Sequence, residues 1–193
     1  MKKSILFIKP ALETDALFDP ISTKIYSGIW YLASLFKDKG YKVRYLDEVV
    51  RNNGLSKHQL FKRTIEGNTV VTELMKLSFE KFEEIKMNDF NRLSSKEFIE
   101  KYSAFQEEGK VIRVIVRTGN SIEETLTEIK KEQPDFVGIP LIASSNYPEA
   151  VKLGAAIKQS FPDIKIVYGG QHLSSEYEFF IKENPWVDHV VVG

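Results

Sequence analysis

The chain has 193 residues, of which 42% are hydrophobic and 12% aromatic, and its 27 Lys and Arg residues balance its 27 Asp and Glu residues. The zero formal net charge argues against a dedicated nucleic-acid binder, and no apolar run approaches the roughly 18 residues of a bilayer-spanning helix. The absence of cysteine excludes disulfides, zinc–thiolate sites, thiol catalysis and iron–sulfur ligation by this chain.

The first 47 residues predict a β-α-β unit. Residues 4–8 form an apolar run that Pro10 ends, which suits a buried strand. Residues 27–40 have apolar positions at helical spacing, with Gly40 placed to end the helix. Residues 41–47 alternate between apolar and charged side chains, as a second strand would.

The start of the chain and its histidines exclude two further classes. The opening apolar run is too short for a signal peptide and has no cleavage pattern, so we expect a cytoplasmic protein. His58, His172 and His189 are far apart and show no metal-ligand spacing. We interpret His172 as a loop residue and His189 as structural, and expect no metal ligand from this chain.

Residues 51–110 contain no proline and differ in character from their flanks. Ser94 and Glu97 have capping-box spacing. A helical face is shared by Val71, Leu74, Met75, Ser78, Phe82 and Ile85. We predict an insertion of two or three helices. It could serve as a lid, dock a partner, or simply pack on its own host domain.

From residue 110 onward the alternation of strands and helices resumes. Residues 110–117 read as an extra strand or an extended connection. The expected strands are 134–142, 163–170 and 187–193, and the expected helices are 120–132, 146–161 and 175–184. Capping boxes are expected at Ser121 with Glu124 and at Ser175 with Glu178, and Pro148 suits a first helical turn. The pattern predicts an α/β fold with a five-stranded parallel sheet and helices on both faces.

Ligands of such sheets bind beyond the carboxyl ends of the strands, at the topological switch point. Three loops, 9–13, 140–146 and 169–175, should therefore lie together at one edge. None carries a GxGxxG or a P-loop motif, and the first lacks the residues that wrap a flavin phosphate. Asp47, at the end of the second strand, is interpreted as a helix or turn cap rather than a phosphoacceptor.

Small, neutral residues remain at this edge. Ala143, Ser144 and Ser145 follow one strand, and Gly169 and Gly170 follow the next. They favour a groove that admits a large, flat or elongated ligand close to the backbone. The serines could instead cap the next helix, and the glycine pair could be a tight turn.

Four segments in this order, GIWYLASLFKDKGYKVRYLD, PDFVGI, VYGGQH and VDHVVVG, resemble the N-terminal cobalamin-binding domain of cobalamin-dependent radical-SAM enzymes. That family includes the anaerobic magnesium-protoporphyrin IX monomethyl ester cyclase type and various methyltransferases. The resemblance covers residues 1–50 and about 111–193, and leaves the block between them unexplained. It implies a flavodoxin-like (Rossmann-like) fold that binds cobalamin, with no activity in this chain alone.

The resemblance also implies a further domain. In the family, a Glu-Gly-Glu segment and a radical-SAM barrel with three clustered cysteines follow the last strand. We therefore expect such a barrel downstream of Gly193, carrying a [4Fe-4S] cluster and S-adenosylmethionine, and this chain to be an excised N-terminal domain.

The resemblance places the cofactor on the carboxyl edge of the sheet. The corrin ring would lie over Pro10–Leu12 and Ala143–Ser145, and its nucleotide tail would enter beside the glycine pair. The cofactor-binding residues so implied are Pro10, Ala11, Leu12, Pro140, Leu141, Ala143, Ser144, Ser145, Gly169, Gly170 and Gln171.

Two departures from related sequences bear on this site. Pro140 and Ile142 stand where methionine synthases and mutases have a Ser-x-Leu motif, so its serine hydrogen bond is lost or passes to Ser144 or Ser145. The loop after the first strand has no histidine, where those relatives supply a cobalt ligand. Cobalamin would therefore bind without a protein histidine on cobalt.

We expect the chain to bind cobalamin and to present it to a radical-SAM barrel of the same parent, without nucleic-acid or membrane partners. One alternative is a degenerate scaffold domain that keeps the fold but not the cofactor, which the two departures motivate and the intact glycine pair opposes. Another is a flavodoxin-like regulatory or protein-interaction module, with the 51–110 block as its partner surface.

Overall fold

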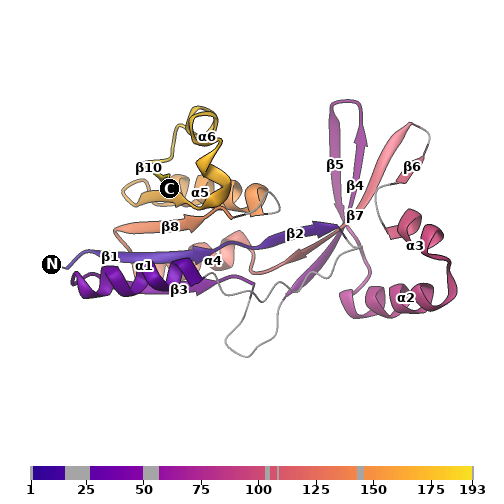
Figure 1. The fold of residues 1–193 in the computed structure, drawn as a ribbon, viewed down its shortest axis with the longest axis horizontal. Coiled ribbons are helices and arrows are strands. Elements are labelled where there is room, and N and C mark those ends of the chain that lie inside the picture. Colours follow the sequence, from indigo (N-terminus) through magenta and orange to yellow (C-terminus); the bar gives the residue numbers. More distant parts are fainter. Residues whose placement is uncertain are drawn as a thin grey trace. The chain divides into compact units, whose positions relative to one another are not determined.

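A computed structural model shows two compact units, which are described separately below (Figure 1). The structure describes residues 2–15, 27–49, 57–102, 105–107, 109–142 and 146–192. The first unit comprises Met1–Leu12, Thr23–Ser56 and Gly119–Gly193, and the second comprises Glu13–Ser22 and Lys57–Thr118. Every helix within the described ranges is too short or too polar to cross a bilayer.

The first unit contains a five-stranded, fully parallel sheet. Its strands are β1 (Ser4–Lys9), β3 (Lys42–Asp47), β8 (Phe136–Pro140), β9 (Lys165–Gly169) and β10 (His189–Val191). They lie in the order β10-β9-β8-β1-β3, and each neighbouring pair is parallel. This order is the flavodoxin-like one, in which the chain adds a strand on one side of β1 and then crosses to the other side. The predicted α/β fold with a five-stranded parallel sheet is confirmed.

Helices cover both faces of this sheet. The helices of the first unit are α1 (Ser27–Asp38), α4 (Ile122–Glu132), α5 (Tyr147–Ser160) and α6 (Tyr177–Glu183), with a 3-10 turn at Gln171–Ser174. Alternate strand residues point to opposite faces, so each strand contributes to two clusters. One face packs Ile5 and Phe7 against Ile29 of α1. The other packs its apolar residues against Ile129 of α4 and Leu153 of α5.

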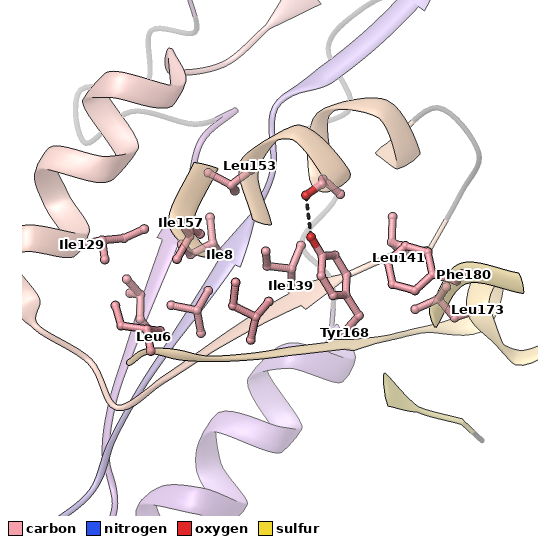
Figure 2. Close-up of a cluster of buried hydrophobic side chains, with 14 residues drawn as sticks. Leu6, Ile8, Ile129, Ile139, Leu141, Leu153, Ile157, Tyr168, Leu173 and Phe180 are labelled. Atoms are coloured by element: carbon pink, nitrogen blue, oxygen red, sulfur yellow. Dashed lines mark hydrogen bonds between the residues drawn. The ribbon is translucent and has the colours of Figure 1, made fainter. Parts of the chain in front are cut away.

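The larger of these clusters surrounds Tyr168, in the middle of the unit (Figure 2). The tyrosine hydroxyl donates a hydrogen bond of 2.7 Å to the Ala150 carbonyl oxygen of α5. The ring packs against Phe180 and Trp186. A Cβ at Gly154 would overlap the Tyr168 hydroxyl and would lie 2.7 Å from the Trp186 ring. Only glycine therefore lets α5 approach the sheet this closely.

Most of the predicted helix ends are confirmed, and one is wrong. Ser121 and Glu124 form the expected capping box, with bonds of 2.9 and 3.2 Å. Pro148 lies in the first turn of α5, and Gly40 follows α1 with a φ of 86°. Ser175, however, does not cap α6, because that helix begins one residue later than the sequence predicts, after Glu176, and has no side-chain cap.

The second unit is a mixed α/β structure. An antiparallel sheet in the order β2-β7-β4-β5, with β6 pairing to β7, is accompanied by two helices among the described residues. The elements are β2 (Leu12–Asp15), β4 (His58–Glu66), β5 (Thr69–Leu74), β6 (Phe105–Glu107), β7 (Lys110–Thr118), α2 (Phe79–Arg92) and α3 (Ser95–Tyr102).

The expected helical face from Val71 to Ile85 is wrong in its first part. Residues 69–74 form strand β5, which pairs with β4 through a turn at Gly67 and Asn68, and α2 begins only after Ser78. The β-branched residues of 69–72 favour a strand, and the Gly67–Asn68 turn closes the hairpin. The extension at 110–117 is a strand of this sheet, and the capping box of Ser94 and Glu97 is confirmed.

A buried carboxylate joins the two helices of the second unit. Asp89 of α2 accepts hydrogen bonds from the Tyr102 hydroxyl and from Lys101 of α3, at 2.7 and 2.5 Å, and from Arg92 at 2.9 Å. These donors hold the pKa of Asp89 well below its usual range, with the Lys101 bond as the largest cause. The helices pack through Phe82 and Tyr102 against the inner strands.

Asp188 ties the last strand of the first unit to its neighbours and gives a pH-dependent stability. It accepts hydrogen bonds from Lys158, the Ile166 N–H and Lys165, at 2.9, 2.9 and 3.0 Å. Burial of the carboxyl raises its pKa, but these donors outweigh burial and lower the pKa to about 2, from an ordinary value of 3.8. A depressed pKa stabilises the folded state above the unfolded pKa, and this contribution is lost as pH falls through the folded pKa.

Replacing Asp188 by asparagine is therefore expected to destabilise the chain by about 1–2 kcal/mol near neutral pH. The difference between native chain and variant should shrink as pH falls from about 4 to about 2. Urea unfolding of both proteins at several pH values measures it. A difference that stays constant across this window would contradict the assignment.

Candidate functional site at the carboxyl edge of the parallel sheet

Three loops leave the parallel sheet at one edge, as the sequence predicts. β1, β8 and β9 run parallel and side by side, so their carboxyl ends at Lys9, Pro140 and Gly169 face the same way. The chain turns to opposite sides of β1 on entering β3 and β8. The switch point therefore lies between β1 and β8, next to the loop that follows β9.

The two adjacent glycines have different roles. Gly170 has a φ of 118°, and a Cβ there would lie 2.5 Å from the Leu141 carbonyl oxygen. The Leu141 N–H donates to the Gly169 oxygen (2.7 Å), and the His172 N–H donates to the Leu141 oxygen (3.2 Å). The group that comes close to Gly170 is thus the backbone of the neighbouring loop. This glycine is required by the fold itself.

Gly169 is not required in this way. A Cβ there would meet the Cβ and the carbonyl oxygen of Val191 at 3.5 Å, which is ordinary van der Waals contact. Since Tyr168 points into the core, the Cβ of the next residue would point to the opposite face of the sheet. Val191 on the adjoining strand is 61% exposed. Among the described residues only Val191 approaches the position of a Gly169 Cβ, so Gly169 leaves space at the strand end that no positive φ explains.

The predicted residues after β1 are buried rather than open. Pro10 is buried, and Ala11 and Leu12 are 1% and 8% exposed. Ala11 lies so close to Gly119, which has a φ of 135°, that a Cβ on the glycine would be 2.7 Å from the Ala11 Cβ. These three residues therefore have little exposed side-chain surface, and their predicted contact with the corrin ring stays a prediction.

Glu48 holds this loop in place. Its carboxylate accepts hydrogen bonds from the Ala11 N–H (2.7 Å) and the Thr125 hydroxyl (2.5 Å), and its backbone oxygen accepts from the Asn120 N–H (3.1 Å). Only 4% of Glu48 is exposed. One carboxylate thus connects the end of β1 to the start of α4, and the loop is preorganised.

A buried ion pair stands beside Glu48. The Lys9 Nζ, with 2% of its side chain exposed, lies 3.2 Å from Asp47 Oδ2. Asp47 also accepts from the Tyr45 hydroxyl (3.2 Å) and from the Val49 N–H (3.0 Å), which is the turn-capping role predicted for it. Sequence reasoning missed Lys9 and Glu48. Lys9 interrupts an apolar run and could have been noticed, whereas nothing local marks Glu48.

The remaining predicted residues divide into three groups. Leu141 is fully buried in the core, while Pro140 is half-buried and Gln171 is exposed at the edge. His172 packs its ring against Tyr147 at 5.9 Å between centroids. Ala143, Ser144 and Ser145 lie outside the described residues.

The remaining features of the described residues concern metal-ligand groups and grooves. No three His, Asp or Glu side chains gather into a metal-ligand set within the described ranges. Two grooves lie at the opposite, amino edge of the sheet, away from every sequence-predicted residue. One is lined by Ser4, Ile5, Leu6, Lys42, Arg44, Glu132 and Pro134, and the other by Ile129, Lys130, Gln133, Pro134, Ser160, Phe161, Pro162, Asp163 and Ile164.

Comparison with known proteins also concerns the carboxyl edge of the parallel sheet. Residues 103–193 match the model of the B12 binding domain family, a stretch that includes β8, β9 and β10 with their loops. The chain is similar to the anaerobic magnesium-protoporphyrin IX monomethyl ester cyclase of Rubrivivax gelatinosus, with 36% identity over 74 residues. That alignment covers 38% of this chain and 13% of the relative. No solved structure matches. The resemblance to a cobalamin-binding domain is confirmed.

Proposed function

We propose that this chain, whose residues 103–193 match the B12 binding domain family, binds cobalamin at the carboxyl edge of its parallel sheet. We further propose that it holds the cofactor for a radical-SAM domain of a larger parent protein. The observation that carries the first proposal is the accessible space at Gly169, which lies within the matched stretch at the expected ligand-binding edge.

The residues present fit an elongated ligand at this position. A Cβ at Gly169 would touch only Val191 among the described residues, and Pro140 and Gln171 at the same edge are at least partly exposed. We propose that the nucleotide tail of cobalamin passes beside Gly169. Gly170 instead allows the loop after β9 to pack against Leu141 in the loop after β8. The serines at 144 and 145 and Ala143 remain proposed contacts of the corrin ring.

The chain's own residues would position the cofactor and support the edge. Glu48 and the ion pair of Lys9 with Asp47 fix the loop after β1, so this side of the site needs no ordering when a ligand arrives. No histidine occurs in the first 57 residues, so this loop offers no imidazole to cobalt. When bound, cobalamin supplies the chemistry of its cobalt centre, and the protein supplies orientation and burial.

A radical-SAM parent is supported by the relative alone. The aligned stretch covers 13% of that cyclase, so the similarity concerns a small part of a much longer protein. A chain without cysteine cannot itself ligate an iron–sulfur cluster. We therefore place the [4Fe-4S] cluster and S-adenosylmethionine in a further domain. The reaction of such a parent could be either a cyclisation or a methyl transfer.

Titration of the purified chain with hydroxocobalamin tests cobalamin binding. Co-elution on gel filtration in a 1:1 ratio, with a saturating change in visible absorbance, is expected. Dicyanocobinamide, which has the corrin ring but lacks the nucleotide tail, is the matched control ligand. If the tail is held beside Gly169, cobinamide should bind at least about tenfold more weakly, which is 1.4 kcal/mol.

Either of two results would overturn this proposal in part or whole. Absence of hydroxocobalamin binding by a folded chain would reject cobalamin binding by this unit. Equal affinity for both ligands would reject the tail position at Gly169 while leaving cobalamin binding in place.

A further inference from the structure

The outer strand of the second unit's sheet is fully exposed. β5 lies at the end of the order β2-β7-β4-β5, and among the described residues no strand pairs with its outer edge. All six side chains of β5 are exposed, with Val70 at 58% and Leu74 at 62%. The backbone N–H and C=O groups on that edge are thus accessible to another strand.

This edge lacks the features with which monomeric proteins protect such strands. Natural edges are blunted by lysines, prolines, bulges or short length. β5 contains no lysine or proline, its register with β4 is regular over six consecutive pairs, and Glu73 is its one charged residue. Its side chains are exposed on both faces of the sheet, which leaves β5 itself without a covering layer.

The sequence of β5 matches a second copy of itself. An antiparallel pair about a twofold axis must place one residue opposite its own counterpart. With Thr72 on the axis, Val70 lies opposite Leu74 of the second copy, and this contact occurs twice. Val71 then lies opposite Glu73 of the second copy, so no two like charges meet.

We propose that two copies of this chain associate through antiparallel pairing of their β5 strands, with Thr72 at the twofold axis. Such a contact is isologous, which is the commonest form of homodimer. It joins two four-stranded sheets edge to edge and covers the most exposed apolar residues of the strand. Because the formal net charge of the chain is zero, two copies do not repel each other through their overall charge.

The contact should be weak and dependent on concentration. A pair of six-residue strands buries less than the ~1,600 Å² of a standard protein interface. Sedimentation velocity of the full chain over a micromolar series should therefore show a shift from monomer to dimer. A chain that remains monomeric throughout the series would overturn the proposal.

Two lysine variants locate the surface. Val70→Lys places a charge in the centre of both Val70–Leu74 contacts, and the dimer should be lost. Met87→Lys is the matched control, because Met87 is 54% exposed on α2 and outside the proposed contact. Loss of the dimer in both variants, or in neither, would overturn the assignment to β5.

The absence of cysteine allows a direct test of register. In the proposed pair the two Thr72 residues face each other with Cα atoms about 4.5–5.5 Å apart, a separation that a disulfide spans. Thr72→Cys should therefore form a disulfide-linked dimer under mild oxidation. Val71→Cys should not, because each Val71 faces Glu73 and its counterpart lies two residues further along. Equal cross-linking of the two variants would reject this register.

Discussion

Replacing Gly169 by valine is expected to weaken cobalamin binding by about 10- to 100-fold while the chain stays folded. The valine side chain would occupy the space where we place the nucleotide tail, and overfilling a fitted site costs about 1–3 kcal/mol. The fold should tolerate it, because a Cβ at Gly169 makes ordinary contact with Val191 and valine suits a strand. Hydroxocobalamin titration measures the loss, and thermal unfolding verifies the fold.

Two companion variants make this result specific. Ser160→Val is the control, because Ser160 is exposed at the end of α5, at the opposite edge of the sheet, and should leave affinity unchanged. Gly170→Val should instead destabilise the chain, since its backbone is in the left-handed region and Leu141 leaves no room. A Gly169→Val chain that is folded and binds with native affinity would contradict the proposed tail position.

Replacing Gly154 by valine should lower the free energy of unfolding by about 3 kcal/mol or more. A Cβ at this position overlaps the Tyr168 hydroxyl and meets the Trp186 ring at 2.7 Å, so α5 must move away from the sheet. Overpacking a tight core typically costs 1–3 kcal/mol, and here the Tyr168 hydrogen bond to Ala150 is strained as well. Urea unfolding measures the change.

Ala156→Val on the same helix is the control for placing a valine in α5 away from Tyr168. Ala156 is half-buried, and its substitution introduces the same β-branched side chain into α5. We expect a cost of well under half of that at Gly154. Similar losses at both positions would contradict a specific clash of residue 154 with Tyr168, since valine is a better helix former than glycine.

The architecture of the first unit follows from local patterns, while the second unit shows where such patterns fail. In the first unit, strands are recognisable as apolar runs that end at Pro10 or at Gly169 and Gly170. These signals can be read from the sequence because each involves only residues that are close together in the chain. Residues 70–85 also show helical spacing, yet their first part is a strand. The turn at Gly67 and Asn68 pairs that part with β4, and this pairing outweighs the periodicity of the side chains.

At the site, the sequence identifies the right edge but not the role of each residue. The glycine pair and the three loops are local features, and the parallel order of the strands brings them together. The need for glycine at 170 arises from Leu141, which is 29 positions earlier in the chain, so no local pattern reveals it. The same is true of Glu48, whose partners Ala11 and Thr125 come from distant segments.

The pairing of β1 with β8 has a consequence for the rate of folding. Ser4 and Asp135 are hydrogen-bonded across 131 positions of sequence, so the central pair of the parallel sheet closes a very long loop. Such closure is slow, because chain entropy is lost before the contacts form. The β4–β5 hairpin lies within that loop and is built from local contacts, so it can form first and shorten the effective distance between the ends. Refolding should then be rate-limited by the joining of β1 to β8, after the local β4–β5 contacts have formed.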